Sequence, residues 1–382
     1  MPEIKVPLCR PQVGNEELEA IREVFESGWL AHGPRVKKFE EDFARYIGVK
    51  YAVSLNSCAS ALQAAIMAYG LKGEIILPSF TFPASANAIV NAGCRPIFAE
   101  VREDTLNLDV NDVLRKITKK TVGIMPVHYA GQACEMDGLV KLCLEKKLTL
   151  IEDSAETIGG TYKGQKTGNF GVGCFSFYPT KNITTGEGGM VTTNEPAIAE
   201  KVKAIRGHGI TKGAYEREAQ NKPWVRVSTM PGYNFRMNEI SAAMGTVQLQ
   251  KMDYMNEKRR EHASYLNKEL LAFKEIKIPV EAKGAYHTYQ MYVVQLDKFV
   301  DRDSFVHYLR ENGIEASVHF YPPVHLHSYY KETFGYKEGT LLVTEKISNC
   351  VVTLPMFPSL TREQLDMVVD SVGKGIKNCR KK

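Results

Sequence analysis

The sequence of 382 residues predicts an α/β protein with a mostly parallel sheet, helices on both faces of that sheet, and a smaller α/β domain at the C-terminal end. Short apolar runs at 75–77, 96–98, 122–127 and 148–151 alternate with stretches of helical periodicity. This alternation is typical of parallel sheets covered by helices on both sides. The chain is also too long for one small core, which favours two domains.

Two amphipathic helices are expected before the first strand. Asn15 can cap the first helix, and Pro34 suits the first turn of the second. One face of the first helix carries four apolar side chains: Leu18, Ile21, Val24 and Phe25. The second helix directs four inward: Val36, Phe39, Phe43 and Ile47. Apolar residues at this spacing indicate helices that pack on one side.

The remaining elements follow in order along the chain. Helices are expected between the predicted strands, near 60–70, 84–92, 109–117 and 135–146. The segment 206–233 is rich in Gly, Lys, Glu and Gln, and we interpret it as a long surface loop. A long helix over 238–268 is expected to form the hinge to the second domain. We therefore predict a large domain over 1–250 and a small domain over 251–382.

Composition narrows the class of protein. The formal charge is +5, and the body of the chain has no dense Lys/Arg run, which argues against a nucleic-acid partner. The N-terminus lacks an apolar signal-peptide core, and no apolar run approaches the roughly 20 residues of a membrane span. We therefore expect a cytoplasmic protein whose eight cysteines are thiols. No CxxC pair suggests a zinc or redox site, so no metal is expected.

One lysine and one aspartate carry the strongest chemical signal. Asp153 comes after the apolar run 148–151 and Glu152, so we expect it to end a buried strand, and Lys181 follows the next apolar segment through a Pro-Thr turn. An aspartate and a lysine so placed are typical of proteins that hold pyridoxal phosphate, in which the amine bonds to the cofactor aldehyde and the carboxylate keeps the pyridine nitrogen protonated. A helix N-cap accounts for a carboxylate at Asp153 equally well, so both interpretations stay open here.

Other segments could contact the same cofactor. Small residues at 56–61 lead from a strand into a helix, where backbone N–H groups and the helix dipole favour an anion. Taken alone, this pattern is more often a capped turn. Phe82 follows a predicted strand and could stack on a flat ring, although core packing is the commoner role. Ser176 shares a strand with the approach to Lys181, and the glycines at 186–189 allow other backbone to come close.

Nucleotide-binding signatures are missing. Gln165 stands where a Walker A loop requires lysine, and no Gly-x-Gly-x-x-Gly follows a predicted strand. The sequence therefore argues against a nucleotide-binding oxidoreductase.

Taken together and in order, these segments resemble the DegT/DnrJ/EryC1/StrS sugar aminotransferases, which belong to the fold-type I pyridoxal phosphate enzymes. The resemblance covers nearly the whole chain. It rests on an ordered set of motifs: Ser27–Leu30, Asn56–Leu62, Pro78–Phe82, Pro126–Gly131, Glu152–Ala155, Ser176–Asn182, Arg206–Gly209, Gly232–Met237 and Leu354–Pro358. The resemblance implies an aspartate-aminotransferase-like fold with a seven-stranded large-domain sheet.

The resemblance also implies a role for each matching residue. Lys181 matches the lysine that bonds the cofactor, and Asp153 matches the partner of the pyridine nitrogen. The other matches to cofactor contacts are Ala59, Ser60 and Ser176 at the phosphate, Phe82 stacked on the ring, and Asn234, which reaches the phosphate from the neighbouring subunit of a homodimer with shared active sites. The candidate substrate contacts are Arg236, for a donor carboxylate, and His319 and His325, which border the sugar site in relatives.

Two departures from the family pattern are visible. Cys58-Ala59 replaces a usual Gly-Thr at the phosphate turn, so Ser60 and Ser176 are expected to compensate. Glu156 stands where many members have glutamine or histidine near the phenolic oxygen of the cofactor.

The resemblance implies transfer of an amino group from L-glutamate to a nucleotide-linked keto sugar, with a 4-keto-6-deoxyhexose as the commonest case. Some relatives are dehydratases with histidine in place of the lysine, so Lys181 favours transamination. A cyclitol or a free keto sugar as acceptor, and a non-catalytic regulatory protein, remain the alternatives.

Overall fold

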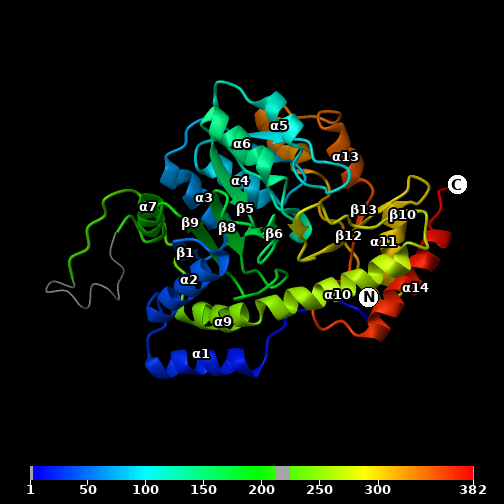
Figure 1. Ribbon diagram of the computed structural model, residues 1–382, viewed down its shortest axis with the longest axis horizontal. Coiled ribbons are helices and arrows are strands. Elements are labelled where there is room, and N and C mark those ends of the chain that lie inside the picture. Colours follow the sequence, from blue (N-terminus) through cyan, green and yellow to red (C-terminus); the bar gives the residue numbers. More distant parts are fainter. Residues whose placement is uncertain (1–2, 211–223, 382) are drawn as a thin grey trace.

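The computed structural model describes residues 3–210 and 224–381. It contains a large sheet built from residues 51–193 and a small sheet built from the C-terminal third of the chain (Figure 1). The large sheet has seven strands, in the spatial order β1 (Tyr51–Leu55), β9 (Gly189–Thr193), β8 (Val172–Ser176), β5 (Thr149–Asp153), β4 (Thr121–Ile124), β2 (Glu74–Pro78) and β3 (Arg95–Ala99). Strand β9 runs antiparallel to both of its neighbours, and the other pairings are parallel. The predicted mostly parallel α/β sheet is confirmed.

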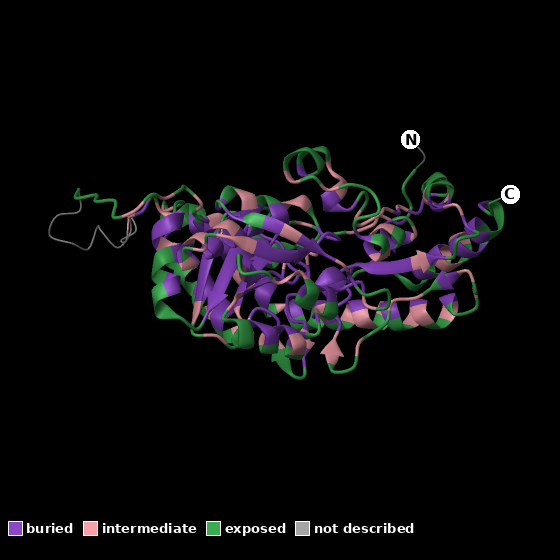
Figure 2. Cartoon of the chain, turned by 90° about the horizontal axis from the view of Figure 1, so that it is seen from above, coloured by how far each residue is buried: buried purple, intermediate pink, exposed green. Residues whose placement is uncertain are grey.

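Helices cover both faces of this sheet, because alternate residues of each strand point to opposite sides. On β5, Ile151 packs in the cluster with α3 (Cys58–Tyr69), α4 (Pro83–Asn91) and α7 (Pro196–Arg206). Its neighbour Leu150 packs on the other side, with α6 (Met136–Lys146) and α5 (Val110–Lys116). The remaining part of that second face is closed by three helices: α2 (Pro34–Ile47), α9 (Glu239–Gln250) and α10 (Met252–Leu270). Figure 2 shows the strands as a buried band between these layers.

The small sheet consists of three antiparallel strands in the order β10 (Ile276–Lys277), β12 (Tyr292–Leu296) and β13 (Val351–Leu354). Its core is closed by α10, α11 (Arg302–Glu311) and α14 (Arg362–Asn378). A further three-stranded sheet pairs β11 (Ala285–Tyr286), β6 (Thr161–Tyr162) and β7 (Gln165–Lys166). The remaining short helices are η1 (Tyr129–Gly131), η2 (Val324–Leu326), α12 (Ser328–Phe334) and α13 (Leu342–Ser348). The proposed boundary at residue 250 falls between α9 and α10 and stays a prediction.

The structure corrects two expectations about helices. Helix α1 (Asn15–Ser27) is capped by Gly14, whose backbone N–H donates to Glu17 at 2.8 Å, so Asn15 lies inside the helix. Val24 is buried, but Leu18 and Phe25 on the predicted apolar face are exposed. The segment predicted as one long helix over 238–268 forms two, α9 and α10, which meet at Lys251.

Two further expectations concern single segments. Gly189 does allow a close approach of backbone, because a Cβ there would meet the Ser57 carbonyl at 2.3 Å. The predicted loop 206–233 is described only in part, since residues 211–223 lie outside the described residues. Within those described ranges, no helix has the length and apolar character that a membrane crossing requires.

Candidate active site

A cavity of about 500 Å³ lies at the carboxyl ends of β5 and β8, between the large sheet and the small one. Ligands of open α/β sheets bind at this edge. Asp153 ends β5 and pairs in register with Cys174 of β8, so Asp153, Ser176 and Lys181 reach the same edge. All three line the cavity. The predicted neighbourhood of the aspartate and the lysine is therefore present in the fold.

Asp153 is a buried carboxylate, with 4% of its surface exposed. It accepts hydrogen bonds from the Ser85 hydroxyl at 2.7 Å and from the Ala155 N–H at 3.2 Å. Among the described residues, no Lys, Arg or His forms an ion pair with it. Burial raises the pKa of Asp153, and the hydrogen bond from Ser85 opposes that shift. The site is thus built to receive a cation.

Lys181 extends from the turn after β8 into the cavity. Its Nζ lies 3.2 Å from Glu156 Oε1, and the exposed fractions of the two side chains are 17% and 6%. The other oxygen of Glu156 accepts the Ala130 N–H at 2.9 Å. Ala130 has a positive φ of 56°, so the turn presents this N–H to the carboxylate. Glu156 therefore holds the free amine of Lys181 from a fixed position.

The turn before α3 forms another wall. Ser57 caps the helix, because its hydroxyl accepts the Ser60 N–H at 3.1 Å. Ser57 and Ala59 line the cavity, but the Ser60 hydroxyl bonds to Asn56 at 2.8 Å and lies 2.9 Å from the Ser57 hydroxyl. The first N–H groups of a helix lack intrahelical acceptors and favour an anion. Ser57 therefore lines the cavity, whereas Ser60 does not.

The candidate substrate residues are distributed unevenly. His319 lines the cavity, and its Nδ1 lies 3.0 Å from the Thr353 hydroxyl. Burial lowers the pKa of His319, opposed by the charge of Glu156. His325 is fully buried, with Nδ1 2.7 Å from the Ser79 hydroxyl and Nε2 3.1 Å from Glu345. It does not line the cavity, so the structure does not support direct substrate contact by His325.

Three other predicted residues occupy different places. Phe82 lines the cavity and is 62% exposed, so it lies at the mouth of the cavity. Asn234 and Arg236 are exposed and do not line the cavity of their own chain.

Several cavity residues were not predicted from the sequence. Ser57, Ser85 and Gln290 line the cavity, as do Cys9 and Glu187. A signal for Ser85 was available, because it lies in the first turn of the helix that follows β2, at the ligand edge of the sheet. No sequence pattern near Gln290 indicates that it lines the cavity. Its contact with Thr180 joins two residues that lie 110 positions apart in the sequence.

A model of the DegT/DnrJ/EryC1/StrS aminotransferase family matches residues 11–373. The chain belongs to this family. It is 36% identical to the spore coat polysaccharide biosynthesis protein SpsC of Bacillus subtilis over 96% of each chain. Among solved structures, it is similar to the aminotransferase TlmJ from Streptoalloteichus hindustanus, with 31% identity, a TM-score of 0.90 and coverage of 98% and 99% of the two chains. It is likewise similar to Helicobacter pylori PseC, an aminotransferase involved in the biosynthesis of pseudoaminic acid, with 29% identity, a TM-score of 0.91 and the same coverage.

The family depends on pyridoxal phosphate, and the chain is a pyridoxal phosphate-dependent aminotransferase. The residues of the cavity fit this cofactor. Asp153 is a buried acceptor without a cation partner among the described residues, which suits a protonated pyridine nitrogen. The N-terminus of α3 suits the phosphate, and the amine of Lys181 is the nucleophile that the aldehyde requires.

Replacement of Glu156 by glutamine is expected to slow amino transfer by roughly tenfold, because the amide keeps a hydrogen bond to Ala130 but loses the charge that holds Lys181. Glu156→Ala removes both interactions and should cost roughly tenfold more. Single-turnover rates with L-glutamate would measure both effects. Equal rates for the glutamine variant and the native enzyme would show that the charge of Glu156 has no part in the reaction.

Proposed function

We propose that this aminotransferase moves the amino group of L-glutamate onto a keto sugar carried by a nucleotide diphosphate, with a 4-keto-6-deoxyhexose as the sugar. The amine product would serve in amino-sugar and polysaccharide biosynthesis. The single observation that carries this proposal is the arrangement of Lys181, Asp153 and Glu156 around one cavity at the ligand edge of the sheet. The similar proteins SpsC and PseC act in spore coat polysaccharide and pseudoaminic acid biosynthesis, which supports a sugar as the acceptor.

Each residue then has a physical task. Asp153 would hold the ring nitrogen in its charged form, Ser57, Ala59 and Ser176 would receive the phosphate, and Phe82 would lie against the ring. When bound, the cofactor supplies an electron sink that makes the α-proton of an amino acid acidic. The amine of Lys181 removes that proton and returns it during the reverse steps with the ketone. Water supplies the keto oxygen of the 2-oxoglutarate that leaves in the first half of the reaction. The ketone oxygen of the sugar leaves as water in the second half, so no net water is consumed.

The charge balance of the cavity supports a homodimer with shared sites. Among the described residues that line it, Lys181 is the one lysine or arginine, and three carboxylates also line it: Asp153, Glu156 and Glu187. A cofactor phosphate and the two carboxylates of glutamate need additional donors. Asn234 and Arg236 are exposed and lie outside the cavity of their own chain, and we propose that a second subunit brings them to this cavity.

An absorbance spectrum of the purified enzyme, recorded before and after L-glutamate is added, tests the first half of the reaction. We expect a visible band of bound cofactor that shifts to the near ultraviolet with glutamate. Nucleotide-linked keto sugars are then supplied, and mass spectrometry of the product should show a ketone converted to an amine. Turnover only with a cyclitol or a free keto sugar would replace the proposed acceptor. A chain that binds no cofactor would contradict the proposal and favour a non-catalytic role.

A further inference from the structure

The backbone on both sides of Lys181 is held by side chains from distant parts of the chain. The Gln290 Nε2 donates to the Thr180 carbonyl at 2.7 Å, and the Arg259 Nη2 donates to the Asn182 carbonyl at 3.3 Å. The lysine therefore lies between two carbonyls that are each fixed from outside its own turn.

Both donors come from elements beyond the large sheet. Gln290 lies between β11 and β12, and Arg259 lies on α10. Both residues are buried: Gln290 is 6% exposed and Arg259 is 4% exposed. Lys181 follows β8 of the large sheet, so the two donors connect the lysine turn to the long helix and to the small sheet. The lysine is consequently anchored to both parts of the molecule.

Each of the two donor side chains also has a buried polar atom without a hydrogen-bond partner in the described residues. A carbonyl only accepts, so Thr180 must face the Nε2 of Gln290, which leaves Gln290 Oε1 buried without a partner. Arg259 Nε and Asn182 Oδ1 are unpartnered as well, so three of the seven buried unpartnered side-chain atoms in the described residues surround this turn. Burying unpaired polar atoms is unfavourable, and a group retained in spite of it calls for an explanation.

We infer that Gln290 and Arg259 are positioning residues, which fix the backbone of Lys181 while its side chain moves between the cofactor and the substrate. This inference rests on the proposed role of Lys181. A general base must stay within hydrogen-bond reach of the proton it removes, and small displacements of reacting groups lower rates strongly. A fixed backbone confines the motion of Lys181 to its side-chain torsions.

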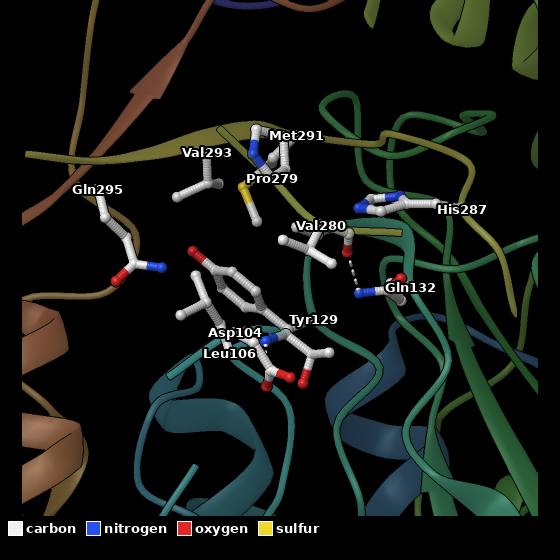
Figure 3. Close-up of a pocket in the computed structure, with 12 residues that line it drawn as sticks. Asp104, Leu106, Tyr129, Gln132, Pro279, Val280, His287, Met291, Val293 and Gln295 are labelled. Atoms are coloured by element: carbon white, nitrogen blue, oxygen red, sulfur yellow. Dashed lines mark hydrogen bonds between the residues drawn. The ribbon is translucent and has the colours of Figure 1, made fainter. Parts of the chain in front are cut away.

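Gln290→Met tests the inference, because methionine keeps the length and removes the donor. Gln132→Met is the control. Gln132 is also buried, its Nε2 donates to the Val280 carbonyl at 3.0 Å (Figure 3), and its Oε1 accepts the Ala282 N–H at 2.6 Å. Neither bond involves residues 178–184. Hydrogen–deuterium exchange of residues 178–184, measured with and without pyridoxal phosphate, reports on the anchoring directly. We expect exchange about tenfold faster or more in Gln290→Met and unchanged in Gln132→Met.

Kinetics give the second readout. We expect the single-turnover rate with L-glutamate to fall by about 10–100-fold in Gln290→Met, with the glutamate concentration at half-maximal rate nearly unchanged. Arg259→Lys keeps the charge but lacks the guanidinium Nη2 that donates to the Asn182 carbonyl. We therefore expect faster exchange of residues 178–184 in this variant as well. It gives a second test if Gln290→Met does not fold.

Two results would overturn the inference. Native exchange rates in Gln290→Met and Arg259→Lys would show that these side chains do not anchor the turn. Exchange that is equally faster in Gln132→Met would show a general loosening of the structure. A native enzyme without a cofactor band would instead refute the proposed function, and the exchange comparison would still decide whether the turn is anchored. The two failures are therefore distinguishable.

Discussion

Replacing Lys181 with alanine is expected to abolish amino transfer, with kcat/KM lower by about 10⁴-fold or more. General acid–base catalysis alone contributes about 10²–10⁴-fold, and the variant also loses the amine that bonds the cofactor. The cavity should keep its shape, because the amine makes one ion pair, to Glu156. Mass detection of the aminated sugar and the spectrum of the protein with pyridoxal phosphate would measure the loss.

A surface lysine provides the control for that experiment. Lys203 on α7 pairs with Glu200 at 2.8 Å on the exterior of the molecule. Exposed pairs of this kind contribute about 0.2–1 kcal/mol, so Lys203→Ala should keep native turnover and nearly native stability. A fully active Lys181→Ala enzyme would end the account of the site given above.

The sheet and its helices were predictable because each depends on local patterns. The apolar run 148–151, followed by Glu152 and Asp153, indicates a buried strand, and that strand must end at the ligand edge of a parallel sheet. The same logic places Lys181 beside it, since the preceding apolar segment forms the neighbouring strand β8. Neither conclusion requires knowledge of contacts between distant residues.

The direction of a single side chain was not predictable in the same way. Ser57 and Ser60 are both small hydroxyl residues at one turn, and only the cap geometry shows that Ser60 bonds to Asn56 and Ser57 while Ser57 lines the cavity. Histidine is a residue type that often binds ligands. The ring nitrogens of His325, however, have hydrogen-bond partners in the interior, namely Ser79 and Glu345. Sequence cannot separate a buried histidine with partners from one that awaits a substrate.

The apolar face of α1 shows a related limit. Helical periodicity predicts that Leu18, Val24 and Phe25 share an apolar side, but of these three only Val24 is buried. In the chain described here, α1 packs on α9 and leaves Leu18 and Phe25 exposed. Gln290 illustrates the same point for polar contacts, because its partner Thr180 is fixed by tertiary structure alone.

Asp153→Asn is expected to change activity and stability in opposite directions. The neutral amide of asparagine provides no negative charge beside a protonated ring nitrogen. We therefore expect kcat to fall by about 10²–10³-fold, as when other preorganised electrostatic groups are removed. Burial raises the pKa of Asp153 above its ordinary value of 3.8 in the cofactor-free protein. The folded state therefore holds this proton more tightly than the unfolded state does.

The sign of the pH dependence follows from that shift. As pH rises from about 3.8 through the raised pKa, the folded state must ionise a buried carboxyl group, and the free energy of unfolding decreases. Asparagine removes this ionisation and keeps an oxygen that can accept from Ser85. The cofactor-free variant should thus equal or exceed the native protein in Tm at pH 8, with a smaller difference at pH 4.

Thermal unfolding at both pH values, with and without pyridoxal phosphate, would measure this balance. The cofactor should raise the Tm of the native enzyme more than that of Asp153→Asn, because only the carboxylate gains a cationic partner on binding. Asp137→Asn is the control, since Asp137 is an exposed partner of Lys163. An Asp153→Asn protein that is less stable than the native chain at pH 8 without cofactor would show that the carboxylate serves the fold. The opposite result would mean that the fold tolerates a buried charge at Asp153 because the bound cofactor neutralises it.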